Sequence, residues 1–183
     1  MRSFAFVLLI FIGSLFISAC SKIDDQTEMN ITIGPSATAY NIPIITSLDT
    51  SQIIAIIPVN LNLDSMIRIQ NKRFASTNIK NIRLNSLELN ITDTAANVTF
   101  DNFENIRMTI EGNGESSNLL ASSNPSDSKV KTLNIPVTAT VNDLKTLVKG
   151  GTINYVLRGK LRRATTKIYA ITATTTFRVA LEL

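Results

Sequence analysis

KIYAITATTTFRVALEL, residues 167–183, is the stretch that decides the fold. Apolar side chains recur there at every second position, with one interruption at Thr175. They are Tyr169, Ile171, Ala173, Phe177, Val179, Leu181 and Leu183. A period of two places these residues on one face of a strand and the intervening polar residues on the other. The stretch therefore predicts a long strand with one buried and one wet face, which is typical of antiparallel sheets.

The segment before it, TINYVLRGKLRR at residues 152–163, has the same period. The residues that we expect to be buried are Ile153, Tyr155, Leu157 and Leu161. Only the short polar linker RATTK, residues 163–167, leads to the final strand. We therefore predict that the two strands pair as an antiparallel hairpin.

Earlier segments repeat the strand pattern between turn-forming residues. We expect a short strand at Ile31 and Ile33. Further strands are predicted within residues 40–45, 52–63, 78–92, 98–112, 118–122 and 131–140. In the segment 78–92 the inward-facing apolar residues are even-numbered at Ile82 and Leu84 and odd-numbered from Leu87 onward. This switch predicts an inserted bulge residue near Asn85–Ser86. The chain then contains eight or nine strands.

One segment between strands changes to a helical period. In LDSMIRIQNKRF, residues 63–74, the spacing predicts a short helix over residues 65–72 with Asp64 as its cap. A strand with Ile67 and Ile69 on one face is the alternative.

A second helix is predicted in VNDLKTLVKGG, residues 141–151, with Asn142 as cap and Gly150 as terminator. Its apolar side consists of Leu144, Leu147 and Val148. Together these elements predict an all-β fold. We expect an antiparallel immunoglobulin-like β-sandwich with two short helical connections over residues 40–183. A jelly roll or a barrel is the alternative.

The beginning of the chain has the pattern of a targeting segment. Arg2 precedes a run of apolar residues that extends to Ile17, which is the length of a signal-peptide core. The following residues, ISAC, resemble a bacterial lipobox and end on the only cysteine, Cys20. The resemblance implies a lipoprotein signal peptide at residues 1–19 and lipidation of the Cys20 thiol. An ordinary signal peptide with an incidental cysteine is the alternative.

Residues 20–39 are polar and predict a lipidated N-terminus followed by a tether. An aspartate directly after the lipidated cysteine resembles an inner-membrane retention signal. Here that position holds Ser21, and the absence of the aspartate implies the outer membrane. Residues 22–25, KIDD, also resemble the short surface-export tags of some Gram-negative lipoproteins. A periplasm-facing and a surface-exposed location both remain open.

Composition excludes several kinds of active site. The formal net charge is +4, and the chain contains no histidine and no tryptophan. A Ser-His-Asp triad and every histidine-bearing zinc site are therefore excluded. We predict no catalytic residue, no metal and no cofactor. Export and the few aromatic side chains also argue against a nucleic-acid partner.

Basic residues are densest around the predicted hairpin. They are Arg158, Lys160, Arg162, Arg163 and Lys167. This cluster predicts an anionic-surface binding site for the phosphate groups of a lipid or a lipopolysaccharide. The alternative is a solvated strand face on which cations suppress edge-to-edge aggregation.

Acidic residues and two short motifs supply further candidates. Four carboxylates lie close together in sequence. They raise two hypotheses, a calcium-binding site and the acid and base pair of a hydrolase. They are Asp101, Glu104, Glu111 and Glu115. Ordinary acidic turns are the alternative. The motifs Asp64-Ser65-Met66 and Asp93-Thr94-Ala95 resemble bacterial glycan-attachment sites.

The order of the motifs IRLNSLELNIT, FDNFENIRMTIEG, LNIPVTATVNDLKTLVKGG and FRVAL resembles a group of small bacterial lipoproteins with an immunoglobulin-like sandwich. A second, partial resemblance, confined to LNIPVTATVNDLKTLVKGGTINYVLRG, is to the late-embryogenesis-abundant water-stress domain. The first resemblance implies an envelope lipoprotein that acts as a non-catalytic binding or structural module. Its partners would be the membrane, through the lipid anchor, and an envelope protein or glycan. A carboxylate-dependent hydrolase and a membrane-surface effector that uses the basic residues are the alternatives.

Overall fold

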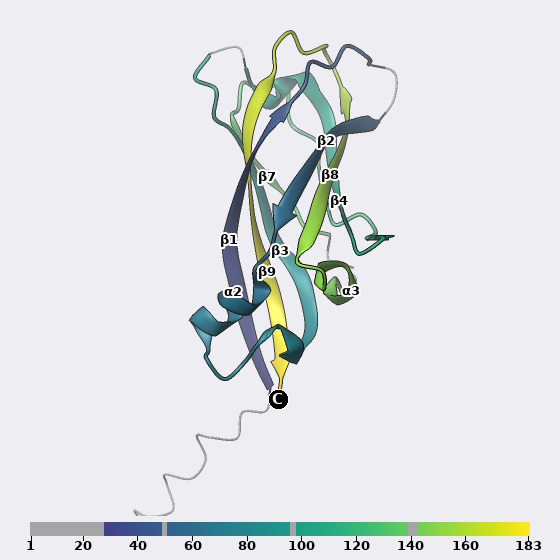
Figure 1. Ribbon diagram of the computed structural model, residues 1–183. Helices are drawn as coiled ribbons and strands as arrows, with labels where there is room; N and C mark the ends of the chain where they lie inside the picture. Colours follow the sequence, from purple (N-terminus) through teal and green to yellow (C-terminus); the bar gives the residue numbers. More distant parts are fainter. Residues whose placement is uncertain (1–27, 49–50, 96–97, 139–142) are drawn as a thin grey trace, which may run out of the picture.

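The computed structural model describes residues 28–48, 51–95, 98–138 and 143–183 (Figure 1). The predicted signal peptide, Cys20 and the cap residue Asn142 lie outside the described residues. The described strands are β1 (Glu28–Ile42), β2 (Gln52–Asn60), β3 (Ile79–Ile91), β4 (Phe103–Gly112), β5 (Glu115–Ser116), β6 (Ala121–Ser123), β7 (Thr132–Ile135), β8 (Thr152–Leu161) and β9 (Tyr169–Glu182). The helical elements are α2 (Leu63–Gln70), α3 (Lys145–Val148) and the 3₁₀ turns η2 (Ser76–Asn78) and η3 (Phe100–Asn102). None of the helices in these ranges combines the length and hydropathy that crossing a bilayer requires.

The strands form two antiparallel sheets that pack as a sandwich. Sheet A has the order β1-β9-β3-β7, and sheet B has the order β2-β8-β4-β5, with β6 also paired to β4. The first strand pairs with the ninth, the second with the eighth, the third with the seventh and the fourth with the sixth. The chain is therefore one long antiparallel ribbon that folds over on itself, and this is the strand order of a jelly roll.

The predicted immunoglobulin-like order is not the one observed. In an immunoglobulin sandwich, neighbouring strands in sequence, such as A and B, share a sheet. Here β1, β2, β3 and β4 alternate between the two sheets. Apolar residues alternate along each strand in the same way in the immunoglobulin-like order and in the observed order. The sequence pattern therefore identified a sandwich but not the order in which its strands are connected.

The predicted hairpin between the last two strands is also wrong. β8 lies in sheet B between β2 and β4, whereas β9 lies in sheet A between β1 and β3. The linker between them crosses from one sheet to the other. The basic residues around it therefore do not share one hairpin face.

The first strand is longer than predicted. β1 starts at Glu28 and pairs with β9 from Glu28–Glu182 to Ile42–Tyr169. Residues 28–39, assigned to the tether by their polarity, thus belong to the sandwich. The Gly34-Pro35 turn signal produces a shift of register within β1 rather than a chain reversal. Gly34 has φ +105°, and a Cβ there would lie 2.8 Å from the carbonyl oxygen of Thr175.

The predicted bulge in β3 is confirmed. The register with β9 shifts between Leu84 and Ser86, so Asn85 has no directly opposite partner. A second shift lies between Ile79 and Asn81 and places the neighbours Lys80 and Asn81 outside the core. Each bulge leaves two consecutive side chains on the outer face, which changes the parity of the buried residues.

The core lies between the two sheets and contains the apolar residues that the alternation selects. Thr175, which interrupts the pattern in β9, is fully buried and shares a 2.8 Å hydrogen bond with the phenol of Tyr155 from the opposite sheet. Burial raises the pKa of the Tyr155 phenol to about 12. The interruption thus supplies the polar partner that a buried tyrosine requires.

The two ends of the sandwich differ in their coverage. At the basal end, where β1 begins and β9 ends, lie α2, η2 and α3 (Figure 1). At the apical end, where β1 ends and β9 begins, the strands are joined by loops and by the single turn η3. The predicted helix at residues 65–72 is confirmed as α2, although it begins at Leu63 and its cap is Asn62. The second helix, α3, is a single turn.

Candidate functional site

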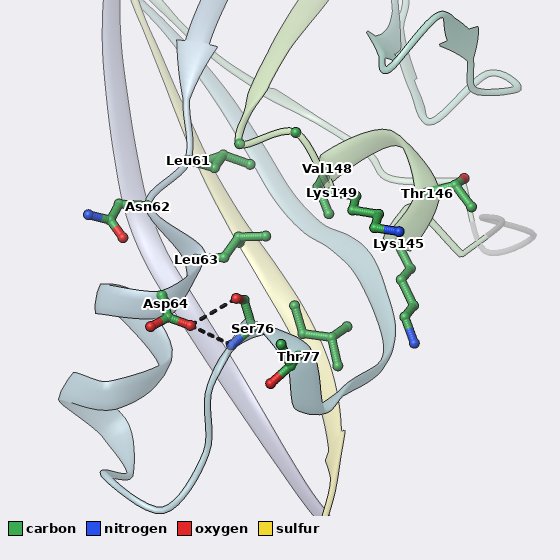
Figure 2. Close-up of a pocket in the computed structure, with 13 residues that line it drawn as sticks. Leu61, Asn62, Leu63, Asp64, Ser76, Thr77, Lys145, Thr146, Val148 and Lys149 are labelled. Carbon is green, nitrogen blue, oxygen red and sulfur yellow. Dashed lines mark hydrogen bonds between the residues drawn. The ribbon is translucent and has the colours of Figure 1, made fainter.

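A pocket of about 750 Å³ opens at the basal end between α2, η2 and α3 (Figure 2). Its volume lies within the range of small-molecule sites. The floor consists of the buried apolar residues Leu61, Leu63, Ile79 and Val148. The rim carries the polar residues Asn62, Asp64, Ser76, Thr77, Lys145, Thr146 and Lys149. We call this site the basal pocket.

The floor is fixed where β2 passes into α2. The backbone N–H of Leu61 donates to the carbonyl of Gly151 at 2.7 Å, which ties the end of β2 to the start of β8. Asn62 then caps α2, because its side-chain oxygen accepts from the backbone N–H of Ser65 at 3.1 Å. The chain turns sharply between Leu61 and Leu63, and both side chains remain buried.

Asp64 holds one wall of the basal pocket together. Its Oδ1 accepts from the backbone N–H and from the hydroxyl of Ser76, both at 2.8 Å, as the dashed lines in Figure 2 show. Its Oδ2 accepts from Arg68 Nε at 2.9 Å. The Ser76 backbone N–H, followed by Arg68 and the Ser76 hydroxyl, lowers the pKa of Asp64 to about 2. The carboxylate therefore joins α2 to η2, and it is not the helix cap that the sequence predicted.

The opposite wall is α3, which is attached through its apolar side. Asp143 Oδ1 accepts from the backbone N–H groups of Ile82 at 2.9 Å and Lys145 at 3.0 Å. The predicted apolar side is confirmed, since Leu144, Leu147 and Val148 are all buried. α3 also packs directly on β4, because Gly112 has no side chain to keep the carbonyl of Leu147 away.

Two ammonium groups lie on the exposed side of α3. Figure 2 shows Lys145 and Lys149 on the wall that faces Asp64 and Ser76. Neither side chain forms an ion pair with another residue in the described part of the chain. An apolar floor beside two unneutralised cations is complementary to a molecule with an apolar body and an anionic group.

Most of the basic residues predicted as an anionic-surface site form internal contacts at the apical end. The Arg162 guanidinium donates to three backbone carbonyls, those of Asp101 at 3.2 Å, Phe103 at 2.6 Å and Pro125 at 2.6 Å. Arg163 forms an ion pair with Asp127. Arg162 thus serves the structure of the apical loops.

The other three basic residues differ in their contacts. Lys160 forms a 2.8 Å ion pair with Glu104 on the neighbouring strand β4. Arg158 lies on the outer face of sheet B, and Lys167 is exposed in the linker between β8 and β9. Arg158, Lys160 and Arg162 thus alternate with buried residues on one outer face, as their period of two predicts, but Lys160, Arg162 and Arg163 are engaged with internal partners.

The four candidate carboxylates are also separated. Asp101 and Glu104 lie at the apical end of β4, and Glu111 and Glu115 lie at its basal end. Glu104 and Glu111 are about 23 Å apart along the strand, at roughly 3.3 Å per residue. Among the described residues no group of three or more acidic, histidine or cysteine side chains is arranged to hold a metal ion. The hypothesis of one site built from all four carboxylates is wrong.

The two glycan-attachment motifs have different surroundings. In Asp64-Ser65-Met66 the aspartate is engaged with Ser76 and Arg68, and the motif lies in the first turn of α2. In Asp93-Thr94-Ala95 the threonine is exposed in an apical loop.

Sequence reasoning missed two pairs of arginines that the sheets bring together. Arg83 of β3 lies directly opposite Arg178 of β9, and Arg107 of β4 lies directly opposite Arg158 of β8. Each arginine stands between two buried residues of its strand, which is the alternation signal for an outer-face position. Their pairing depends on the register between distant strands, and the sequence carries no separate signal for it.

No protein-family model and no curated protein sequence matches the chain. Among solved structures, the chain is similar to a chain from the semi-empty VLP of Macrobrachium rosenbergii nodavirus, a virus of the giant freshwater prawn. The TM-score is 0.39 and the sequence identity is 10%. The match covers 91% of this chain and 90% of that one. It is also similar to a chain of the Gt strain of infectious bursal disease virus, with TM-score 0.40, 9% identity, and coverage of 86% and 34%. For Cocksfoot mottle virus the TM-score is 0.34 and the identity 9%, with coverage of 85% and 97%.

Proposed function

We propose that the chain is a lipid-anchored, non-catalytic binding module of the bacterial outer membrane. Its basal pocket would bind a molecule that has an apolar body and an anionic group. The observation that carries the proposal is the combination, in one pocket, of a floor of buried apolar residues with the ammonium groups of Lys145 and Lys149.

The lipid anchor rests on the lipobox-like sequence before Cys20. Cys20 precedes Glu28, the first residue of β1, by only eight positions. Such a segment spans at most about 28 Å when fully extended. A diacylated cysteine would therefore hold the basal end, with its pocket, near the membrane surface. The three chains of a bacterial lipoprotein exceed the two signals that stable anchoring requires.

The separation of the four candidate carboxylates supports a role without catalysis. Glu104 is paired with Lys160, and Glu115 accepts a hydrogen bond from the Thr146 hydroxyl. A glycosidase needs two carboxyl groups about 5 to 9.5 Å apart across its substrate. Glu104 and Glu111, at opposite ends of β4, are too far apart for this, so no such pair combines an apical with a basal carboxylate.

The pocket proposal is tested with decanoate as the anionic probe and 1-decanol as its neutral counterpart. Binding is measured by calorimetry on residues 28–183, the segment that carries every described strand. The double variant Lys145→Gln/Lys149→Gln should bind decanoate about tenfold more weakly, which corresponds to about 1.4 kcal/mol. The double variant Lys129→Gln/Lys167→Gln removes the same charge at the apical end and should bind like the wild type.

Equal weakening in both double variants would show that net charge, rather than the pocket, attracts decanoate. Binding of 1-decanol as tight as that of decanoate would remove the role of the two lysines. Either result contradicts the pocket proposal.

The anchor is tested separately in a Gram-negative host. The wild-type chain should incorporate labelled palmitate and fractionate with the outer membrane, whereas Cys20→Ser should do neither. Ser21→Asp should keep the palmitate label and move to the inner membrane. Palmitate labelling of Cys20→Ser at the wild-type level would refute the anchor. Protease accessibility on intact cells then distinguishes a surface-exposed from a periplasm-facing domain.

A further inference from the structure

The outer face of sheet A carries two arginines that have no internal partner. Arg83 and Arg178 lie directly opposite each other on β3 and β9, and both are exposed. Neither side chain forms a hydrogen bond or an ion pair with another described residue. Residues directly opposite in an antiparallel pair have Cβ atoms only about 4.5 to 5.5 Å apart, and like charges in that position repel. The arrangement costs stability unless an anion lies between the guanidinium groups.

A hollow of about 540 Å³ opens beside this pair. Ala180, the residue of β9 two positions after Arg178, lines this hollow. Across the sheet, Ala180 is flanked by Asn30 of β1 and Asn81 of β3. The short alanine side chain leaves space between longer neighbours. The two amide side chains border this space from either side.

The third cation of the hollow is present because of the bulge in β3. The register shift between Ile79 and Asn81 places Lys80 on the outer face next to Asn81. Lys80 Nζ lies 2.7 Å from Glu28 Oε1 and 3.3 Å from Glu182 Oε2. These carboxylates neutralise Lys80 and close the hollow on the side away from the arginines. The three cations and two carboxylates leave one net positive charge, and the two cations without a carboxylate partner are Arg83 and Arg178.

We propose that this hollow binds a phosphate group, with Arg83 and Arg178 as its two principal contacts. The planar guanidinium fork matches phosphate oxygens with two parallel hydrogen bonds, and two forks from adjacent strands offer more donors than a single carboxylate accepts. The amide groups of Asn30 and Asn81 provide further donors at the sides of the hollow. The site lies on the outer face of sheet A. It depends neither on the basal pocket nor on the lipid anchor.

A matched pair of arginines on the other sheet provides an internal control. Arg107 and Arg158 are also directly opposite and exposed. Their neighbours in the same row across sheet B are Ile53 and Ser122. This row has the same two charges as the proposed site. The next outward row carries one amide and one lysine, Asn105 and Lys160, and lacks the second amide and the short alanine between them.

The experiment uses phenylglyoxal, which modifies free guanidinium groups, with mass spectrometry of the peptides to follow each arginine. The full chain in a neutral detergent is treated with and without millimolar inorganic phosphate, with sodium chloride holding the ionic strength constant. Phosphate should slow the modification of Arg83 and Arg178 about fivefold or more, since protection grows as one plus the ratio of ligand to Kd. Arg107 and Arg158 should react at unchanged rates. Equal protection of both pairs, or of neither, would overturn the proposal.

Variants give an independent measurement. Phosphate should raise the melting temperature of the wild type and of Arg107→Gln by the same amount, and Arg178→Gln should lose that increase. Without phosphate, Arg178→Gln should melt no lower than the wild type, because the substitution removes a repulsion from an exposed face. A phosphate-dependent increase that persists in Arg178→Gln contradicts the assignment.

The same phosphate chemistry occurs free in solution and in lipid headgroups, and one further arm distinguishes the two sources. The full chain is placed in phosphatidylglycerol vesicles without inorganic phosphate and modified as before. Protection of Arg83 and Arg178 there assigns the site to a phospholipid headgroup. Protection by inorganic phosphate alone assigns it to a soluble phosphate compound.

Discussion

The apical and basal ends of the sandwich use their positive charges differently. At the apical end, Arg162 donates to three backbone carbonyls and Arg163 is paired with Asp127. At the basal end, Lys145 and Lys149 lie unpaired on the rim of a pocket with an apolar floor. In the stretch with the densest positive charge in sequence, Lys160, Arg162 and Arg163 are therefore engaged with internal partners.

The difference follows from how the backbone N–H and C=O groups at each end find hydrogen-bond partners. Several loops meet at the apical end, and loop carbonyls without a strand partner need side-chain donors. At the basal end, short helices and 3₁₀ turns satisfy much of their own backbone, and Asn62, Asp64 and Asp143 accept from the remaining N–H groups. Lys145 and Lys149 are thus left available to a ligand, whereas the basal cations Arg68 and Lys80 are paired with carboxylates.

The largest effect should come from removing the apical arginine. Arg162→Ala leaves the carbonyls of Asp101, Phe103 and Pro125 without their shared donor and should lower the free energy of unfolding by about 2 to 4 kcal/mol. Arg158→Ala removes the same charge from an exposed strand position and should stay within about 0.5 kcal/mol of the wild type. Chemical denaturation measures both. Equal losses would mean that the two arginines do not differ as described.

The next effect concerns the contact between α3 and β4. In Gly112→Ala the new methyl group would collide with the carbonyl oxygen of Leu147 and approach Ile153 Cγ2 to 3.0 Å. Such overpacking should cost about 1 to 3 kcal/mol. Because α3 must move, decanoate binding should also weaken without any loss of charge. Gly150→Ala, where a Cβ meets nothing within 4 Å, is the matched control for stability and should leave the free energy of unfolding unchanged.

A smaller, pH-dependent effect tests the wall formed by Asp64. Its pKa is about 2 in the folded chain against 3.8 without these contacts. The folded form therefore binds this proton less readily, so the contribution of Asp64 to stability is present above about pH 4 and is lost as the pH falls toward 2. Asp64→Asn should flatten the stability curve in that window.

Arg68→Gln provides the graded control for Asp64. It removes the contribution of Arg68 and keeps the larger one of the Ser76 backbone N–H, and should retain part of the slope. Thermal denaturation at several pH values measures the three curves. Identical slopes in the wild type and Asp64→Asn would contradict the assignment.

The smallest effect on stability is expected for the lysines of the basal pocket. Lys145→Gln/Lys149→Gln should change the free energy of unfolding by no more than about 0.5 kcal/mol, because both side chains are exposed and unpaired in the described structure. A larger loss in denaturation would show that these lysines have structural partners, as Arg162 does.

Much of the fold could be predicted because burial leaves a direct trace in sequence. The alternation in residues 167–183, the bulge at Asn85 and the helix at α2 are all local patterns. The partner of each strand leaves no such trace. A short linker between β8 and β9 suggested a hairpin, but in a jelly roll a linker of that length crosses between the sheets.

The sites were harder to predict for the same reason. Charge density along the chain selected Arg162 and Arg163, whose contacts with carbonyls and with Asp127 come from other loops. The pair Arg83 and Arg178 required the register between β3 and β9. The cap of α2 was assigned to Asp64 rather than to Asn62, two positions earlier, because both residue types accept from helix N–H groups.

The position of β9 between β1 and β3 also determines when the domain can fold. Both neighbours precede β9 in the chain, and the pair Glu28–Glu182 joins residues from opposite ends of the described sequence. Sheet A lacks the strand between β1 and β3 until residues 169–182 have been added to the chain. Folding must then bring together residues that are far apart in sequence, which costs loop-closure entropy. Domains dominated by such distant contacts fold on the order of milliseconds to seconds. Until then residues 28–42 lack the strand that pairs with them in sheet A, and their backbone N–H and C=O groups are unpaired edges of the kind that promote aggregation.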